Sequence, residues 1–203
     1  MVVQRGNYVL TGAGIIYLIL SIIAIFNAFY YERPYQVFWF CYAGMFLIGI
    51  GLLGHEKALV QSQLYLFLIP DLVWTLDFAS YFIQGETILG ITDYFFEPAP
   101  LSAKIVSLTH IATIPLGLYF FYHRGVIRKP YYLATWLQLA LIYFITRWAT
   151  DAHENVNCVY APCGAITLPG VYSAWWFALS FIMVYVTHVI VLKIMPSRAA
   201  LPD

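Results

Sequence analysis

Three ionisable side chains interrupt long apolar stretches of this sequence. Asp77, His110 and Arg147 each lie in a different stretch, and an ionisable group in the hydrocarbon of a bilayer costs about 3 kcal/mol or more. A histidine near a carboxylate can act as a general base, and a guanidinium can bind a phosphate or carboxylate through its fork of donors. Cys41, in another apolar stretch, adds a thiol that such a base could activate. These residue types are typical of a catalytic or ligand-binding cavity inside a membrane.

Helix geometry predicts that these groups share one depth. At a rise of about 1.5 Å per residue, all four side chains lie roughly 8 to 12 Å from the outer ends of their predicted helices. We therefore expect Asp77, His110 and Arg147 to line one cavity that is open to the outer half of the membrane. The expected catalytic residues are His110, Asp77 and Cys41. The expected substrate-binding residues are Arg147, Asp71 and Asn157.

A purely structural role for the polar layer is the alternative. A buried Asp–Arg or Asp–His pair can join membrane helices without any catalytic purpose. We favour a functional site because three ionisable residue types and a thiol converge, whereas a single pair would be enough to join helices. Pro115 adds local support, since it cannot donate to the carbonyl of Ile111 and should bend the helix beside His110.

The elements that position these residues follow from composition. Hydrophobic residues make up 62% of the 203 positions and charged residues only 10%, whereas a soluble domain is about a quarter charged. The formal net charge is zero, so no nucleic-acid partner is expected. The sequence therefore predicts an integral membrane protein.

Six apolar stretches predict an all-α bundle of six transmembrane helices. Each is about 20 residues long, the length that crosses a bilayer, and polar or turn-forming residues separate them. We expect residues 1–203 to form a single transmembrane domain. The predicted helices cover residues 8–31, 35–54, 61–84, 102–122, 131–152 and 172–194.

The distribution of basic residues orients this bundle. With the N-terminus inside, seven basic residues fall on the inner side and three on the outer side, which the positive-inside rule favours. Both termini are therefore expected in the cytoplasm, in a multi-pass protein of the cell inner membrane. The seven are Arg5, Lys57, Arg124, Arg128, Lys129, Lys193 and Arg198, and the three are Arg33, Lys104 and Arg147.

The outer connection over residues 151–170 contains two cysteines. Cys158 and Cys163 are five positions apart with Pro162 between them, a spacing that is compatible with a small disulfide loop in an oxidising compartment. We expect this disulfide to form while Cys41 stays reduced, and two free thiols are the alternative. The sequence has neither an HExxH motif nor a CxxC pair, so no metal site is predicted, and no cofactor can be named.

Several short motifs resemble those of uncharacterised bacterial integral membrane proteins with six helices. They are GITDYFF at 90–96, LTH at 108–110 followed by Pro115, NVNCVY at 155–160 and YVTH at 185–188. The resemblance covers residues 65 to 190 and implies no activity. A fainter similarity extends to intramembrane fatty-ester hydrolases and acyltransferases, which place a nucleophile on an early helix and a histidine on a middle one. His110 looks like that histidine, and Cys41 stands where a serine or threonine would be expected.

Two function classes follow from these observations. The first is a membrane-embedded enzyme that acts on a lipid or isoprenoid ester from the extracytoplasmic leaflet. The second is a non-catalytic accessory or scaffold subunit of a larger membrane complex that binds pigment or lipid. Membrane lipids are expected partners in both cases, and other membrane protein subunits are expected in the second. The residues alone leave the choice between enzyme and subunit open.

Overall fold

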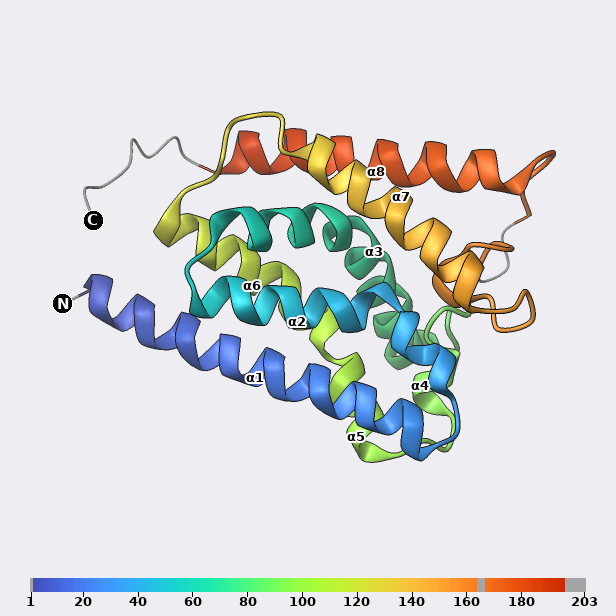
Figure 1. The fold of residues 1–203 in the computed structure, drawn as a ribbon. Coiled ribbons are helices and arrows are strands. Elements are labelled where there is room, and N and C mark those ends of the chain that lie inside the picture. The colour runs from blue at the N-terminus through green and yellow to red at the C-terminus, as the bar shows by residue number, and fades with distance from the viewer. Residues whose placement is uncertain (1, 164–166, 196–203) are drawn as a thin grey trace.

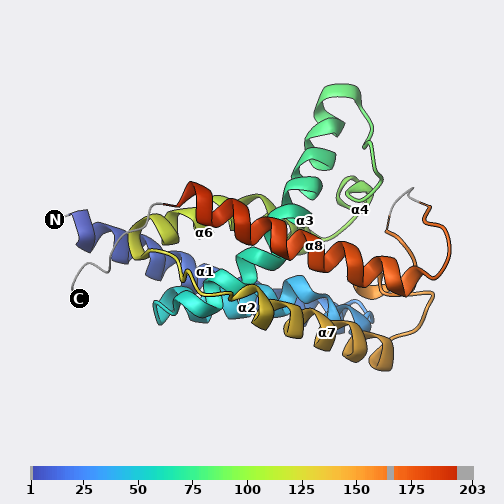
Figure 2. The same cartoon turned by 90° about the horizontal axis from the view of Figure 1, so that it is seen from above.

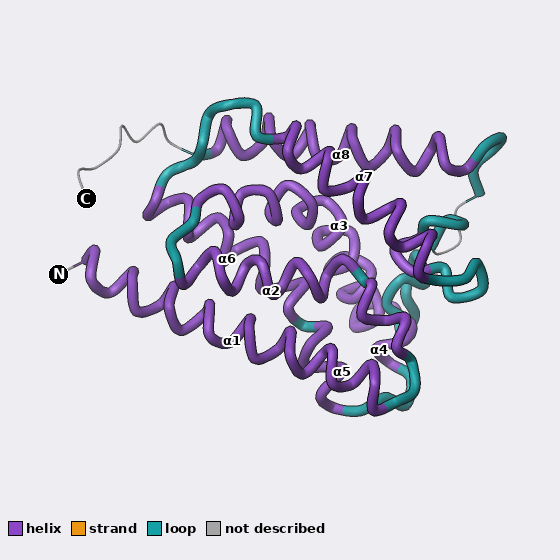
Figure 3. The backbone as a smooth tube through the Cα atoms, viewed as in Figure 1, coloured by secondary structure: helices purple, strands orange, loops and turns teal. Residues whose placement is uncertain are grey.

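The computed structural model describes residues 2–163 and 167–195, with side chains described from Asn7 onward. Within these residues every regular element is a helix, which confirms the all-α prediction (Figures 1 and 3). Both ends of the described chain lie at the same end of the bundle (Figure 1). The elements are α1 Val2–Tyr30, η1 Pro34–Phe38, α2 Phe40–Leu53, α3 Lys57–Gln84, α4 Asp93–Phe96, α5 Leu101–Ser107, α6 Thr109–Arg124, α7 Tyr132–Ala149, η2 Val156–Cys158 and α8 Tyr172–Ile194.

In the described part of the chain, four helical segments are long and apolar enough to cross a membrane. They are Asn7–Tyr30, Lys57–Gln84, Leu101–Arg124 and Tyr172–Ile194. The apolar helix α2 is shorter, with 14 residues. The protein therefore has the composition and helix lengths of a membrane protein, while the count of six spans stays a prediction.

The first half of α3 forms the centre of the bundle. Every residue from 61 to 68 is buried, because α3 packs against α2, α6, α7 and α8. Its polar side chains find partners at this depth. Gln61, for example, donates to the carbonyl of Ile127 and accepts from the Ile127 N–H, both at 2.8 Å. A helix that is buried all round is typical of a core element.

The second half of α3 leaves the bundle at Pro70. Proline removes a backbone donor, and its ring clashes with the carbonyl four residues earlier, here that of Leu66. Beyond this point α3 turns away from the other helices and projects from the bundle with α4 beside it (Figure 2). We call residues 72–96 the arm. The depths expected from the sequence assumed a straight helix. They therefore do not hold for the residues of α3 that follow Pro70.

The predicted helix over 102–122 is broken into α5 and α6 at Leu108. The Ile111 N–H donates to the carbonyl of Leu108 at 3.1 Å, which is a tighter turn than an α-helix makes. The carbonyl of Ser107 is instead bonded by the imidazole of His110 at 3.1 Å. The break thus lies next to the histidine, within two turns of Pro115.

Candidate functional site

A small cavity lies between α2, α3 and α6. Its volume of about 10 Å³ is on the scale of a single water molecule. The apolar part of the wall consists of Met45, Ile48 and Phe67. The polar or nucleophilic part consists of Cys41, Asp71, Thr109, His110 and Thr113. The structure therefore brings together three of the residues that the sequence singles out, namely Cys41, Asp71 and His110.

Asp71 is the most unusual component of this wall. Its side chain is 2% exposed, and no described residue forms a hydrogen bond with its carboxylate. It directly follows Pro70, so the bend of α3 sets its position. Buried polar groups are normally hydrogen-bonded, and those that are not are expensive and call for an explanation. A carboxylate that faces a cavity without a protein partner is free to interact with a ligand, a water or a proton.

His110 is held in one orientation by its own backbone. A carbonyl oxygen can only accept, so Nδ1 of His110 donates to the carbonyl of Ser107 at 3.1 Å. This leaves Nε2 as the basic nitrogen of the neutral ring. The ring of Trp74, which comes from the arm, lies over the imidazole with 5.0 Å between centroids. The histidine is therefore fixed by α5 on one side and by the arm on the other.

Trp74 is itself tied to the arm. Its indole N–H donates to the hydroxyl of Tyr94 at 3.0 Å, and that hydroxyl donates to Oγ of Ser107 at 3.4 Å. Desolvation of the Tyr94 hydroxyl raises the pKa of this phenol above its ordinary value. The base of the arm and the segment that holds His110 are thus connected.

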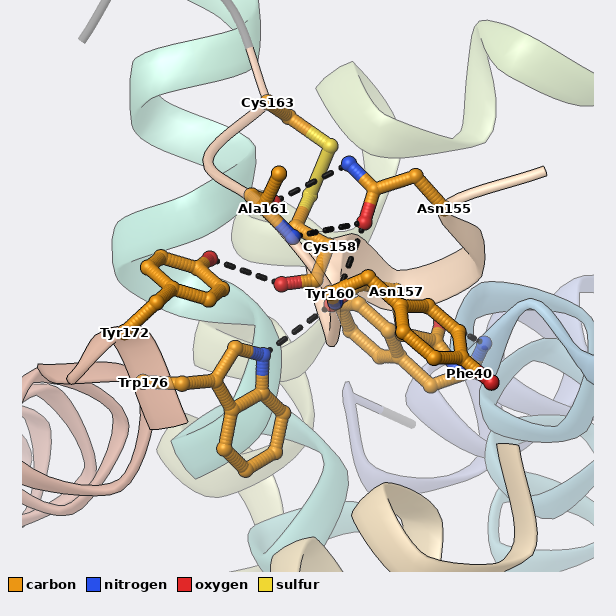
Figure 4. Close-up of a disulfide and its surroundings, with 9 residues drawn as sticks. All are labelled: Phe40, Asn155, Asn157, Cys158, Tyr160, Ala161, Cys163, Tyr172 and Trp176. Atoms are coloured by element: carbon orange, nitrogen blue, oxygen red, sulfur yellow. Dashed lines mark hydrogen bonds between the residues drawn. A yellow bond between two sulfur atoms is a disulfide. The ribbon is translucent and has the colours of Figure 1, made fainter. Parts of the chain in front are cut away.

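Cys41 is the single free thiol of the protein. Its three cysteines are Cys41, Cys158 and Cys163, and the last two form a disulfide, as the spacing predicted (Figure 4). Cys41 is the second residue of α2. Its position therefore depends on where α2 begins.

Asn157 fixes that starting point. Its side-chain oxygen accepts from the N–H of Phe40 at 2.8 Å (Figure 4). Its side-chain nitrogen donates to the carbonyl of Phe38 and to Oγ1 of Thr146, each at 2.8 Å. Trp176 donates to the Asn157 carbonyl at 3.1 Å. The side chain expected to bind substrate is thus occupied by the protein, and it holds the disulfide loop against the first turn of α2.

Asp77 lies in the arm, outside the cavity that contains His110. Its carboxylate accepts from the N–H of Leu89 at 2.6 Å and from both the N–H and Oγ1 of Thr92 at 2.9 Å. These bonds hold the connection between α3 and α4. The expected convergence of Asp77 with His110 is therefore not found, because the bend at Pro70 carries Asp77 out of the bundle.

Arg147 also lies apart from this cavity. Its guanidinium stacks on Tyr160 at 4.6 Å and donates to the hydroxyl of Tyr143 at 3.1 Å and to the carbonyl of Val159 at 3.3 Å. It fastens the disulfide loop to α7. Arg147 lies in the last turn of α7, and its neighbours are loop groups rather than the cavity.

Tyr17 is a neighbour of the cavity that the sequence interpretation missed. Its hydroxyl bonds Oγ1 of Thr113 at 3.0 Å, and Thr113 in turn donates to the carbonyl of Thr109 at 2.8 Å. Tyr17 is 3% exposed. Tyrosines in membrane helices favour the interface at the helix ends. Tyr17 lies instead in the middle of the first apolar stretch, and this position could have identified it as a polar group inside the bundle.

No group of three or more His, Cys, Asp or Glu residues that could hold a metal ion occurs among the described residues. No family model matches the chain, and neither a curated protein nor a solved structure matches it. The chemistry of the cavity therefore carries the functional assignment.

Proposed function

We propose that the protein is a membrane-embedded enzyme that cleaves a lipid ester taken from the extracytoplasmic leaflet. The observation that carries this proposal is the buried carboxylate of Asp71, which has no hydrogen-bond partner among the described residues and shares a cavity with Cys41 and His110. A thiol, a base with a free nitrogen and a nearby anion are the parts that nucleophilic acyl transfer needs.

The chemistry would run in two steps. The Cys41 sulfur attacks the ester carbonyl while Nε2 of His110 takes the thiol proton, and a C–S bond forms. The tetrahedral intermediate then expels the alcohol, which receives the proton from His110, and a thioester remains. Water, deprotonated by the same nitrogen, hydrolyses the thioester and restores the thiol. The Asp71 carboxylate would stabilise the positive imidazolium in both steps.

We propose six passes with both termini in the cytoplasm. The basic residues Lys57, Arg124, Arg128 and Lys129 belong to the connections at the end of the bundle where the described chain begins and ends (Figure 1). Arg198, which was counted with them, lies outside the described residues. The disulfide loop contacts the opposite end of the bundle through Asn157 and Phe40. In a cell inner membrane this end would face the oxidising side.

The test is ester turnover by the purified protein in detergent. Chromogenic acyl esters serve as probes, and the variants are Cys41→Ala, His110→Ala and Asp71→Asn. Loss of a general base or its partner typically lowers the rate by about 10²- to 10⁴-fold. Turnover by each of the three variants should therefore fall by about 10²-fold or more, while the amount of folded protein stays constant. The matched controls are His153→Ala and Asp151→Asn, whose side chains are exposed and should not matter. Wild-type turnover in all three cavity variants would rule out this site.

The second candidate function is an accessory subunit, and the arm is the observation that favours it. Leu72, Leu76, Phe82 and Ile83 are exposed on the arm, which projects from the bundle (Figure 2). A neighbouring subunit, a pigment or lipid could cover this face. Pull-down in mild detergent separates the two functions. A stoichiometric partner that is lost with Phe82→Ser but kept with Cys41→Ala would support the subunit.

A further inference from the structure

The hydrogen-bond donors and acceptors in the wall of the cavity between α2, α3 and α6 do not balance. Asp71 contributes a carboxylate, which can only accept when it is ionised. His110 contributes Nε2, which accepts in the neutral ring because the Nδ1 proton is donated to the carbonyl of Ser107. No described residue donates a hydrogen bond to either group. The wall therefore has two acceptors that need a donor from within the cavity.

The two threonines of the wall cannot supply the missing donors. The hydroxyl of Thr113 donates to the carbonyl of Thr109 at 2.8 Å, and the hydroxyl of Thr109 donates to the carbonyl of Val106 at 2.7 Å. A hydroxyl has a single proton, so each threonine oxygen can only accept from a molecule in the cavity. Among the described side chains of this wall, the thiol of Cys41 is the one donor that remains.

A water molecule has the size and the hydrogen atoms that this wall lacks. The cavity volume of about 10 Å³ corresponds to one water. The two hydrogens of that water can be donated to Asp71 and to Nε2 of His110, while its oxygen accepts from the thiol of Cys41. Buried waters typically make about three bonds to polar groups that lack a protein partner. Such a water also lowers the cost of burying the carboxylate without a donor.

A divalent metal ion fits this cavity less well than water. Mg²⁺ and Ca²⁺ take about six or more oxygen ligands. The side chains of the wall offer four oxygens, namely the two of Asp71 and one each from Thr109 and Thr113. The rest of the wall is a thiol, a neutral imidazole and apolar side chains, so the composition favours a neutral ligand.

We infer that the cavity holds one resident water that bridges Asp71 and His110, and that this water is the acyl acceptor. The water site stands without any activity, whereas its catalytic role rests on the proposed function. In that reaction the water oxygen attacks the thioester carbonyl on Cys41 while Nε2 of His110 takes a proton. The C–S bond then breaks, the sulfur receives that proton and a carboxylic acid leaves. Because the cavity admits only a water-sized molecule, an alcohol cannot replace water, and the protein hydrolyses esters without transferring the acyl group to alcohols.

Radiolytic footprinting tests the water site without relying on turnover. A short X-ray pulse forms hydroxyl radicals from bound as well as bulk water, and methionine in contact with them is oxidised to the sulfoxide. Met45 lines the cavity and is 3% exposed, so its peptide should be oxidised despite its burial. The matched control is Leu139→Met, at an 8% exposed position of the apolar core outside this cavity. The side chain introduced there should stay unoxidised at the same dose.

Two replacements of Asp71 make this measurement decisive. Asp71→Asn keeps a polar group that can hold water, so the oxidation of Met45 should remain. Asp71→Leu puts an apolar side chain of similar size in the wall and removes an unpaired charge, so the fold should persist. Oxidation of Met45 should then fall to the level of the Leu139→Met control. Unoxidised Met45 in the wild type, or equal oxidation in the wild type and Asp71→Leu, would overturn the water site. A melting temperature raised by Na⁺ but not by choline would assign the cavity to a cation and also overturn it.

The acyl acceptor is tested by ester turnover in buffer that contains methanol. The wild type should form only the free acid, whereas a soluble cysteine hydrolase with an open site, as the positive control, should also form the methyl ester. Methyl ester formed by the wild type would overturn the role of the water as the exclusive acceptor. Oxidised Met45 without turnover of any ester would keep the water site and remove the enzyme. Turnover that depends on Cys41 while Met45 stays unoxidised would keep the enzyme and remove the resident water.

Discussion

The bend of α3 and the arm beyond it each bury one aspartate, and the two carboxylates have opposite surroundings. Asp77 in the arm is 1% exposed and accepts three hydrogen bonds from Leu89 and Thr92. Asp71 at the bend is 2% exposed and lines a cavity without a hydrogen-bond donor from the described residues. Only six positions separate them on one helix.

The difference shows that depth and residue type do not identify a functional carboxylate. A buried carboxylate whose oxygens accept hydrogen bonds from backbone N–H groups holds the surrounding chain in place. A buried carboxylate without donors weakens the fold unless it is protonated or bound to a ligand. The second kind is the better candidate for chemistry, and the comparison between Asp71 and Asp77 can be tested directly.

Replacing Asp71 should have the largest effect on activity. Asp71→Asn removes a buried negative charge that the protein does not pair, so the free energy of unfolding should stay the same or rise. Ester turnover should nevertheless fall by about 10²-fold or more, because the imidazolium of His110 loses its counter-charge. Turnover assays and thermal unfolding in detergent measure both. A variant that unfolds easily and keeps its turnover per folded molecule would reverse the roles given to the two aspartates.

Replacing Asp77 should show the opposite pattern. Asp77→Asn puts amide hydrogens in front of the N–H of either Leu89 or Thr92, which leaves at least one donor unpaired. We expect a loss of about 1.5 to 3 kcal/mol in the free energy of unfolding. Amide exchange should accelerate over residues 87–92, whereas turnover per folded molecule should remain. Unchanged exchange in that segment would contradict the structural role.

The contact of Trp74 with His110 sharpens the comparison, because it joins the two regions. Trp74→Phe keeps an aromatic ring near His110 but loses the hydrogen bond to Tyr94. The free energy of unfolding should fall by about 1 kcal/mol, and turnover should change little. Trp148→Phe, at a side chain that is 87% exposed, provides the matched control and should change neither quantity. A large loss of turnover in Trp74→Phe alone would assign the indole N–H a direct role.

His55 extends the comparison to the end of the bundle where the described chain begins and ends, and it should have the smallest effect. Its Nδ1 is buried without a hydrogen-bond partner among the described residues. Burial, followed by the nearby charge of Arg124, lowers the pKa of this imidazole below its ordinary value of 6.5. The folded state therefore favours the neutral ring. The contribution of His55 to the free energy of unfolding is therefore complete above pH 6.5. It is lost as the pH falls from 6.5 toward the lowered pKa.

The measurement is the melting temperature in detergent across this pH range. His55→Asn should flatten its dependence on pH, because asparagine does not titrate and tolerates the positive φ of 55° at this position. A wild-type curve that is already flat, or a variant curve as steep as that of the wild type, would show that His55 does not contribute.

Several features of the protein were determined by the sequence itself. Apolar stretches of membrane length predicted helices, because the periodicity and hydropathy of a helix are local properties. The spacing of Cys158 and Cys163 predicted their disulfide. The choice of Cys41 and His110 as neighbours also came from residue type and estimated depth.

Only the tertiary structure decided which polar groups are already occupied. Asn157 bonds the N–H of Phe40, which lies 117 positions away in the sequence, and Arg147 contacts a loop that folds back onto its helix. The bend at Pro70 directs Asp77 into the arm and leaves Asp71 facing the cavity. Hydrogen-bond partners of this kind depend on how distant segments pack, and local sequence patterns do not contain that information.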